Sequence, residues 1–392
     1  MGEQIKKGMA LLIIHLFNCL PIRKNKLFFM SYYGSQYGCN PKYITEYILN
    51  HYPSDTFDIV WAFNEPDHMG RETGFRKVKV MSLRYFYDMC TAKVIITNFR
   101  TTDLFVKRKK QHYIQTWHSS LRLKQIEKDA ENFLPENYVK MAKKDSRKCD
   151  VLLSGCQLST DIFKRSFWFE GDIMETGTPR NDLFFHTDHQ KKEDILKKLG
   201  IKAGEKVVLY APTFRKDQGL DVYKFDYKKV LDELASKYGG SWKLLIKLHP
   251  HMRNKSKDLM FGKRVIDVTP YNDIQELLYI SDVLISDYSS LMFDFTLTKR
   301  PCFLYVPDLN DYLTHERGLY FEIKKLPFIH AESSEELLEK IRKFEEEEYQ
   351  NQIDHFTAAT GTFEKGNACQ QVTEHIKAVC GTEKERIQLE AI

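Results

Sequence analysis

The chain has 392 residues, which is more than one ordinary hydrophobic core accommodates, so we expect two domains. Its net charge of +5 is small for this length and does not indicate a nucleic-acid partner, although it suits anionic substrates or an anionic membrane surface. None of the eight cysteines forms a C-x-x-C pair or a zinc-spaced cluster. Several lie in apolar runs, which is typical of buried free thiols in a reducing, cytosolic compartment.

The N-terminal segment is apolar but short. Residues Met9 to Phe17 follow Lys6 and Lys7, and no small-residue cleavage site comes after them. No run of about 20 apolar residues occurs, so we expect no transmembrane helix. Two interpretations of the segment stay open: an amphipathic helix lying on a membrane surface, or an ordinary first helix packed on a domain.

Strand and helix patterns alternate along both halves of the chain, which predicts parallel sheets covered by helices. The expected fold class is α/β, with two Rossmann-like doubly wound domains facing across a cleft. A polar stretch from Phe185 to Lys191 separates an N-terminal domain, residues 1–187, from a C-terminal domain, residues 188–392. The last helix, Asn367 to Val379, is free in this scheme to pack back on the N-terminal domain. The expected strands are Lys26–Ser31, Phe57–Phe63, Val78–Met81, Val94–Thr97, Gln111–Trp117, Val151–Ser154, Ile173–Thr176, Lys206–Tyr210, Trp242–Leu248, Arg264–Val268, Val283–Ser286 and Cys302–Val306.

One expected helix, Arg122 to Lys148, is strongly basic. It is either a membrane-facing surface or a solvated face, and its interleaved carboxylates favour the solvated face. The other expected helices are Pro41–His51, Ser82–Thr91, Lys192–Leu199, Tyr227–Tyr238, Asp273–Ile280, Leu291–Leu297 and Ser334–Glu347.

A candidate anion site follows the strand Val283–Ser286. Ser289 and Ser290 stand between this strand and the next expected helix, where helix N–H groups and hydroxyls together favour phosphate. Four other strand ends carry His or Arg, and the carboxyl ends of parallel strands share one edge of a sheet, so we predict a shared site there. These five loops begin His118-Ser119-Ser120, Gly177-Thr178-Pro179-Arg180-Asn181-Asp182, Ala211-Pro212-Thr213-Phe214-Arg215, His249-Pro250-His251 and Asp287-Tyr288-Ser289-Ser290.

Together with Thr116-Trp117, Lys247-Leu248, Phe293-Asp294 and Lys299-Arg300-Pro301, these loops resemble the motifs of the CDP-glycerol glycerophosphotransferase family. The family comprises the teichoic-acid primases and polymerases of Gram-positive bacteria, with related capsule enzymes. The resemblance runs from Gln115 to Pro307. It implies a GT-B-like fold whose C-terminal domain binds the donor, and His118 and His249 as the catalytic pair. The substrate-binding positions that it implies are Ser119, Ser120, Arg180, Thr213, Arg215, Lys247, Ser289, Ser290 and Asp294.

The sequence departs from the family pattern beside His118. The family usually continues from this histidine with glycine, whereas this chain has Ser119, which adopts positive φ less readily. The departure leaves the backbone shape of the loop open. Because the histidine itself is retained, we still expect an active enzyme.

The resemblance implies transfer of glycerol phosphate from CDP-glycerol to a hydroxyl of a lipid-linked saccharide or polyol-phosphate acceptor, with release of CMP, in teichoic acid or capsule synthesis. Imidazole has a suitable pKa for accepting the proton of that hydroxyl, so His118 is the expected general base. His249, Arg180, Arg215 and the Ser289–Ser290 loop are expected to stabilise the phosphates. The expected location is the cytoplasmic face of the membrane, as a peripheral protein.

Several alternatives stay open from the sequence. The donor is CDP-glycerol or CDP-ribitol, and the enzyme a primase, polymerase or capsule enzyme. A nucleotide-sugar glycosyltransferase using Glu316 or Glu322, or a non-enzymatic binder, fits the motifs less well. Asp287 and Asp294 are available to Mg²⁺, but arginines and helix N–H groups offer the same positive charge, so we expect no bound metal and no cofactor.

Overall fold

The structure is a computed structural model, and it describes residues 2–68, 73–215, 220–249, 252, 262–315 and 318–381. The chain divides into two compact units, each of which is described by itself. The first unit contains the chain up to residue 120, residues 126–182 and the chain from residue 363; the second contains residues 121–125 and 183–362. The chain therefore joins the second unit for a short segment directly after Ser120.

The first unit is built on a seven-stranded sheet in which every neighbouring pair is parallel, in the order β3-β2-β1-β4-β5-β6-β7. The direction of winding reverses between β1 and β4, and in sheets of this kind ligands bind at the carboxyl ends of the strands beside such a switch point. The strands are β1 (Arg23–Met30), β2 (Asp58–Phe63), β3 (Arg76–Lys79), β4 (Ala92–Thr97), β5 (His112–Gln115), β6 (Val151–Leu153) and β7 (Asp172–Met174).

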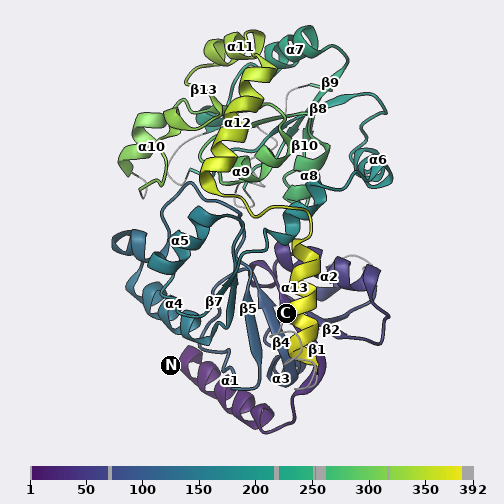
Figure 1. Ribbon diagram of the computed structural model, residues 1–392, viewed down its shortest axis with the longest axis vertical. Coiled ribbons are helices and arrows are strands. Elements are labelled where there is room, and N and C mark those ends of the chain that lie inside the picture. Colours follow the sequence, from purple (N-terminus) through teal and green to yellow (C-terminus); the bar gives the residue numbers. More distant parts are fainter. Residues whose placement is uncertain are drawn as a thin grey trace. The chain divides into compact units, whose positions relative to one another are not determined.

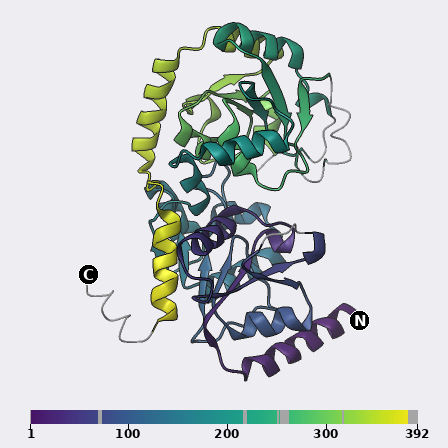
Figure 2. The same cartoon turned by 90° about the vertical axis from the view of Figure 1, so that its right-hand side faces the viewer.

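Helices cover both faces of this sheet, and alternate residues of β1 show why. Leu27 and Phe29 join a core with residues of α2 and α13, whereas Phe28 points to the other face and its ring meets that of Tyr85 in α3. α13 lies beside α2, and α1 lies beside α3 (Figure 1 and Figure 2). The helices are α1 (Gly2–Asn18), α2 (Cys39–His51), α3 (Leu83–Thr91), α4 (Glu136–Lys148), α5 (Gln157–Ser166) and α13 (Ala368–Cys380).

The second unit repeats the scheme with a six-stranded parallel sheet in the order β10-β9-β8-β11-β12-β13. Its switch point lies between β8 and β11, which are the strands that lead into the Thr213 and Ser289 loops. The four central strands β9, β8, β11 and β12 are almost wholly buried, as expected for a parallel sheet with both faces covered, whereas the edge strands β10 and β13 are mostly half-buried. They are β8 (Lys206–Tyr210), β9 (Trp242–Ile246), β10 (Val265–Asp267), β11 (Val283–Ser286), β12 (Cys302–Tyr305) and β13 (Ile329–Ala331).

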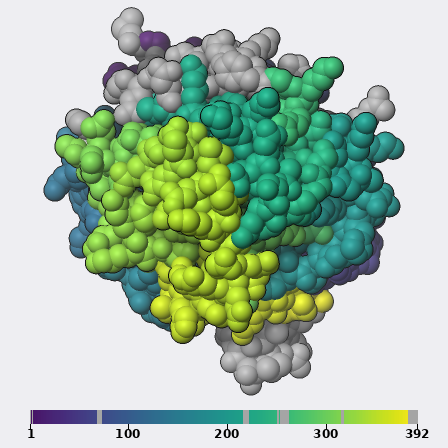
Figure 3. Space-filling model, turned by 90° about the horizontal axis from the view of Figure 1, so that it is seen from above, coloured from purple at the N-terminus to yellow at the C-terminus, as the bar shows by residue number. Residues whose placement is uncertain are grey.

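Seven described helices accompany this second sheet. Figure 3 shows the face where yellow-green residues of α11 and α12 lie beside teal residues of α7. An ion pair at 2.8 Å joins Arg342 of α11 to Glu233 of α7. The helices are α6 (His189–Lys198), α7 (Tyr227–Tyr238), α8 (Ile274–Ile280), α9 (Leu291–Phe295), α10 (Leu309–His315), α11 (Ser334–Arg342) and α12 (Glu346–Thr360).

The expected α/β fold class is confirmed, but two expected helices were wrong. The segment predicted as one helix from Arg122 to Lys148 begins extended, since Lys124 pairs with Leu319 in an antiparallel bridge. A 3₁₀ helix, Glu127–Phe133, follows, and only α4 is α-helical. Pro135 separates the two because it cannot continue a helix. The predicted helix Ser334–Glu347 is likewise two helices, α11 and α12.

The N-terminal segment is a single helix, α1, with two different faces. Ala10 and Ile14 are buried, whereas Ile5, Met9, Leu12 and Leu16 are 56 to 63% exposed. None of the helices that the structure describes combines the length and hydropathy needed to span a bilayer. All eight cysteines lie in described parts of the chain, and each is a free thiol.

Candidate active site

In the first unit, three strand ends bring His118 to the switch point of the sheet. β5 ends at Gln115, and the chain turns through Thr116 and Trp117 to His118. β4, which pairs with β5, ends beside Asn98. The Asn98 side-chain oxygen accepts a hydrogen bond from the Tyr32 N–H at 2.9 Å, and Tyr32 follows β1. The ends of β1, β4 and β5 are thus joined around one histidine.

The imidazole of His118 is exposed, and two contacts fix its orientation. Its Nδ1 lies 3.4 Å from the Asn98 carbonyl oxygen, and a nitrogen facing a carbonyl must carry the proton. In the neutral ring, Nε2 is therefore the nitrogen able to accept a proton. The ring also stacks on Trp117, with centroids 4.5 Å apart and planes inclined by 27°, and Trp117 packs edge-on against Phe167. The buried indole gives the imidazole a firm support.

The unusual backbone geometry of this loop lies at Trp117, whose φ is 49°. Ser119 is not among the described non-glycine residues with positive φ, so the serine in place of the family glycine imposes no strain of that kind. Ser119 and Ser120 are both buried, and the Ser120 carbonyl accepts a hydrogen bond of 2.5 Å from the Ser159 hydroxyl. A Cβ at Gly155 would stand 2.2 Å from the Ser120 hydroxyl oxygen, so this glycine makes room for the serine.

The Arg180 loop follows β7 and is hydrogen-bonded to Glu364, a carboxylate distant in sequence. Glu364 accepts hydrogen bonds from the Thr178 N–H at 3.0 Å and from the Asn181 amide at 3.1 Å. Gly177 has a φ of 87°, and a Cβ there would lie 2.9 Å from a Glu364 oxygen. Glycine is therefore required at this turn for both reasons.

Asp182 closes the same loop by accepting the first N–H groups of α13, from Ala368 at 3.0 Å and Cys369 at 2.7 Å. A carboxylate in this position caps the helix and is stabilised by the positive end of the helix dipole. The Arg180 guanidinium is buried, with Nη1 3.5 Å from the Cys39 sulfur. The Arg180 loop is thus fixed by α13 on one side and by the start of α2 on the other.

In the second unit, Thr213 and Asp287 join the two strands at the switch point. Both Asp287 carboxylate oxygens accept from the Thr213 N–H, at 2.8 and 2.9 Å, and one accepts from its hydroxyl at 2.6 Å. The loops after β8 and β11 are therefore one hydrogen-bonded structure. The sequence offered Asp287 as a carboxylate available to Mg²⁺; in the structure it accepts hydrogen bonds from the neighbouring loop.

Arg215 lies in the centre of this structure and is almost fully buried. Its guanidinium donates to Asp287 at 2.6 Å and to Asp308 at 2.9 and 3.2 Å, and the hydroxyl of Tyr288 also donates to Asp308 at 3.0 Å. Burial lowers the pKa of Arg215, but the two carboxylates outweigh that effect and raise it. Burial raises the pKa of Asp308, but the bonds from Arg215 outweigh it and hold that pKa below its usual range. Arg215 thus holds three loops together.

An aromatic stack extends this cluster to the segment that follows His118 in the chain. Tyr288 and Tyr312 are parallel, with centroids 3.5 Å apart, and the Lys124 ammonium lies 5.1 Å from the Tyr312 ring centroid. The Leu123 N–H donates to the Ser290 hydroxyl at 3.2 Å. Residues 121–125 are therefore bonded directly to the predicted phosphate loop.

The remaining predicted residues of the Ser289 loop differ in exposure. Ser289 and Ser290 are partly exposed, whereas Asp294 is fully buried and accepts from the Gln275 amide at 3.4 Å. The predicted helix Leu291–Leu297 is shorter, since α9 ends at Phe295 and a 3₁₀ turn follows. A helix of five residues contributes only a small dipole to the predicted anion site.

His249 and Lys247 follow β9, beside the Thr213 loop. His249 is exposed, and its ring centroid lies 5.5 Å from that of Phe214. The Lys247 ammonium donates to the carbonyls of Thr269, at 2.8 Å, and Tyr271. Lys247 therefore ties the end of β9 to the loop after β10.

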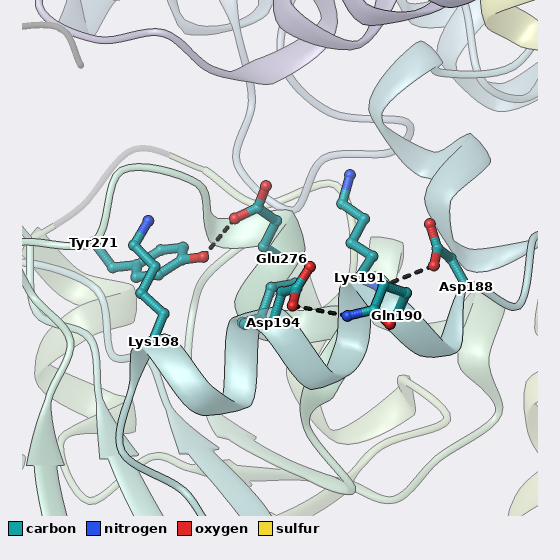
Figure 4. Close-up of a pocket in the computed structure, with 8 residues that line it drawn as sticks. Asp188, Gln190, Lys191, Asp194, Lys198, Tyr271 and Glu276 are labelled. Carbon is teal, nitrogen blue, oxygen red and sulfur yellow. Dashed lines mark hydrogen bonds between the residues drawn. The ribbon is translucent and has the colours of Figure 1, made fainter. Parts of the chain in front are cut away.

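A cavity of about 360 Å³ opens beside that loop, between α6 and α8 (Figure 4). Lys198 lies against the Tyr271 ring, and the Tyr271 hydroxyl points to Glu276. Three carboxylates and two ammonium groups line the cavity, so it has no excess of positive charge for a phosphate. Its lining consists of Asp188, Gln190, Lys191, Asp194, Ile195, Lys198, Tyr271 and Glu276, none of which is a predicted site residue.

Some sequence-based candidates receive little or no support. Glu322, considered for a glycosyltransferase, is exposed and paired with Lys325 at 2.8 Å. Glu316 and His251 lie outside the described residues. Within the described parts of the chain, no three His, Cys, Asp or Glu side chains come together in a way that would hold a metal ion.

Three residues that join these loops were missed in the sequence. Asn40, Asp308 and Glu364 each bond to a predicted motif from a distant part of the chain. Asn40 follows the first strand, and that strand end carries neither His nor Arg, which were the residue types that singled out the other loops. Asp308 follows β12 as a polar residue just past a strand end, and this position could have marked it as a candidate. Nothing in the sequence around Glu364 marks it.

Comparisons with known proteins identify the family of this chain. The family model described as CDP-glycerol:poly(glycerophosphate) glycerophosphotransferase matches residues 12–378. A teichoic acid poly(glycerol phosphate) polymerase of Bacillus spizizenii is 31% identical over 93% of this chain and 95% of its own length. A teichoic acid glycerol-phosphate transferase of Staphylococcus aureus is 33% identical over 90% of this chain and 93% of its own length.

The fold comparison leads to the same group. The solved wall teichoic acid polymerase TagF, in a histidine variant soaked with CDPG, superposes with a TM-score of 0.83 at 28% identity, over 99% of both chains. The two sheets found here are thus those of a GT-B-like enzyme, as the sequence motifs implied. The family model covers nearly the whole chain, and both relatives align over most of this chain and of their own length. This chain therefore belongs to the CDP-glycerol glycerophosphotransferase family.

Proposed function

We propose that this enzyme transfers glycerol phosphate from CDP-glycerol to a hydroxyl of a lipid-linked acceptor in teichoic acid synthesis, and releases CMP. The family match supports the reaction class. The observation that carries the assignment of roles is the His118 ring, exposed and supported by Trp117, with Nδ1 on a backbone carbonyl. That geometry leaves Nε2 as the basic nitrogen that a general base requires.

The proposed step is a single displacement at phosphorus. The acceptor hydroxyl gives its proton to Nε2 of His118, and its oxygen forms a bond to the phosphorus that carries glycerol. The bond from that phosphorus to the CMP oxygen breaks, and CMP leaves with the electron pair. Negative charge grows on the leaving phosphate, where fixed donors are needed.

We assign the donor contacts to the exposed or partly exposed predicted residues of the second unit, namely Thr213, His249, Ser289 and Ser290. Arg215, Lys247 and Asp294 shape the same loops from within, since each bonds to neighbouring loops or helices. In the first unit, Arg180, Ser119 and Ser120 maintain the loops beside His118. This division follows the exposure of each side chain except for Lys247, which is partly exposed but whose ammonium is bonded to two backbone carbonyls.

The N-terminal helix supports peripheral attachment to the membrane that carries the acceptor. Ile5, Met9, Leu12 and Leu16 form an exposed apolar row at helical spacing, and Lys6 beside it is also exposed. A row of this kind with neighbouring cations suits an anionic bilayer surface. We propose that α1 lies in that surface, on the cytoplasmic face.

Turnover with purified protein tests the proposal. CDP-glycerol, CDP-ribitol and a UDP-sugar are each supplied with a glycerol-phosphate-primed lipid acceptor, and CMP and UDP are measured. We expect CMP from CDP-glycerol, and its release from CDP-ribitol alone would change the donor. UDP release without CMP would contradict the proposed reaction.

Two alanine variants test the role of His118 as the general base. His118→Ala is expected to lower kcat by about 100- to 10,000-fold, the usual contribution of a general base. His51→Ala is the matched control, because His51 is also exposed and its Nδ1 also faces a backbone carbonyl, that of Tyr47 at 2.9 Å. Equal activity of the two variants would refute the role of His118.

A further inference from the structure

Asn40 connects the two loops of the first unit that carry His118, the predicted general base, and Arg180, a predicted substrate-binding residue. It is fully buried at the start of α2. Its side-chain N–H₂ group donates to the carbonyls of Thr116 and Trp117, both at 3.1 Å. Its side-chain oxygen accepts from the Arg180 N–H, also at 3.1 Å. One amide thus bonds to the peptide that leads into His118 and to the loop that carries Arg180.

The Trp117 contact matters because that residue is strained. A tryptophan at a φ of 49° costs on the order of 1–2 kcal/mol and persists only where its surroundings impose it. Asn40 holds the Trp117 carbonyl, the Thr116 hydroxyl donates to the same oxygen at 3.0 Å, and the Gln115 side chain accepts the Trp117 N–H at 3.0 Å. Both sides of the strained residue are therefore fixed by side-chain amides.

The orientation of His118 depends on this geometry. The Trp117 carbonyl belongs to the peptide bond whose nitrogen is that of His118, so rotation of this peptide moves the imidazole. Rotation would also separate the stacked Trp117 and His118 rings and withdraw Nδ1 from the Asn98 carbonyl. Only an amide supplies two donors toward the carbonyls and an acceptor toward Arg180 in one planar group.

We infer that Asn40 is a positioning residue for the transfer reaction, which holds the strained Trp117–His118 peptide and fixes it relative to the Arg180 loop. The inference rests on the proposed role of His118 as the general base. Asn40 does not touch the reacting atoms in this scheme. It acts through the direction in which the imidazole points.

The test compares Asn40→Ala and Asn40→Asp with Thr45→Val in the full-length protein. Thr45 is an equally buried polar residue of the same helix, and its hydroxyl bonds to Trp61 and to the Pro41 carbonyl, away from the His118 loop. Asn40→Asp keeps the acceptor for Arg180 and nearly the same volume but loses both donors. Thermal unfolding places the three variants on one scale of stability.

Both Asn40 variants are expected to lower kcat by about 100-fold, the usual cost of misplacing a reacting group by about 1 Å. The KM for CDP-glycerol should stay within about threefold of wild type. Thr45→Val should lose comparable stability with a wild-type kcat.

Wild-type kcat in a folded Asn40→Asp protein would overturn the inference, and so would an equal loss of kcat in Thr45→Val at equal stability. If neither Asn40 variant folds while Thr45→Val does, the residue is essential to the fold rather than to the base, which also overturns it. Failure of the proposed function is separate, because wild-type enzyme would then release no CMP from CDP-glycerol.

Discussion

The exposed row on α1 gives a quantitative prediction for membrane binding. Leu12 and Leu16 are each 63% exposed, so replacing both with Gln removes apolar surface without disturbing the core. Full burial of a leucine is worth about 1.5–3 kcal/mol, and scaling by the exposed fraction gives about 1–2 kcal/mol for each side chain. The double substitution should therefore weaken binding by about 2–4 kcal/mol, which is roughly a 30- to 1,000-fold lower partition coefficient.

Flotation with vesicles of phosphatidylglycerol and phosphatidylcholine measures this change. Glutamine forms helix nearly as well as leucine, so circular dichroism and the melting temperature should stay unchanged. Leu313→Gln is the matched control, since Leu313 is an exposed leucine of α10 in the second unit. Flotation of the α1 double variant at wild-type levels would refute the reasoning, and so would an equal loss in Leu313→Gln.

Three further predictions concern stability. Arg215→Met leaves two buried carboxylates without their cation and should lower the free energy of unfolding of the second unit by about 3–5 kcal/mol, measured by urea denaturation; a loss below 1 kcal/mol would contradict the described network. Gly177→Ala places a methyl group against Glu364 at positive φ and should cost more than about 1 kcal/mol, whereas Gly200→Ala, at positive φ in open space, isolates the backbone part of that cost. Burial and the neighbouring His375 lower the pKa of His112 to about 4, so the unfolded chain binds more protons than the folded chain between pH 6.5 and 4. The free energy of unfolding should therefore fall by up to about 3 kcal/mol as the pH decreases through that window. His112→Phe should flatten this decline, which a series of melting curves at different pH values measures.

Local patterns in the sequence were sufficient for much of the fold. Strands such as Lys206–Tyr210 and Val283–Ser286 were predicted at their observed bounds, because short apolar runs bounded by turns identify buried parallel strands. The alternation of strand and helix implied parallel sheets, and a parallel sheet places all its carboxyl ends at one edge. The motif loops at those ends, including those of His118 and Ser289, were therefore expected to lie at the functional edge of their sheets.

Helix prediction failed where long-range contacts outweighed local periodicity. Residues 121–125 carry a basic helical pattern, yet Leu123 and Gln125 are bonded to Tyr320 and Gly318 as an extended segment. Local propensity is a weak preference that tertiary contacts override. The predicted helix Leu291–Leu297 was also too long, since α9 has only five residues. The helix dipole expected at the Ser289 loop is correspondingly small.

The sequence by itself determined the class of the fold, the family and the loops that carry candidate chemistry, because these follow from local patterning and residue order. Only the tertiary structure decided how those loops are held. Asn40 reaches Arg180 across 140 positions, and Glu364 reaches Thr178 across 186. Such partners leave no local periodicity, since a hydrogen bond between distant segments depends on the folded path of the chain. For the same reason, the burial of Arg215 between Asp287 and Asp308 became visible only when three strand ends were brought together.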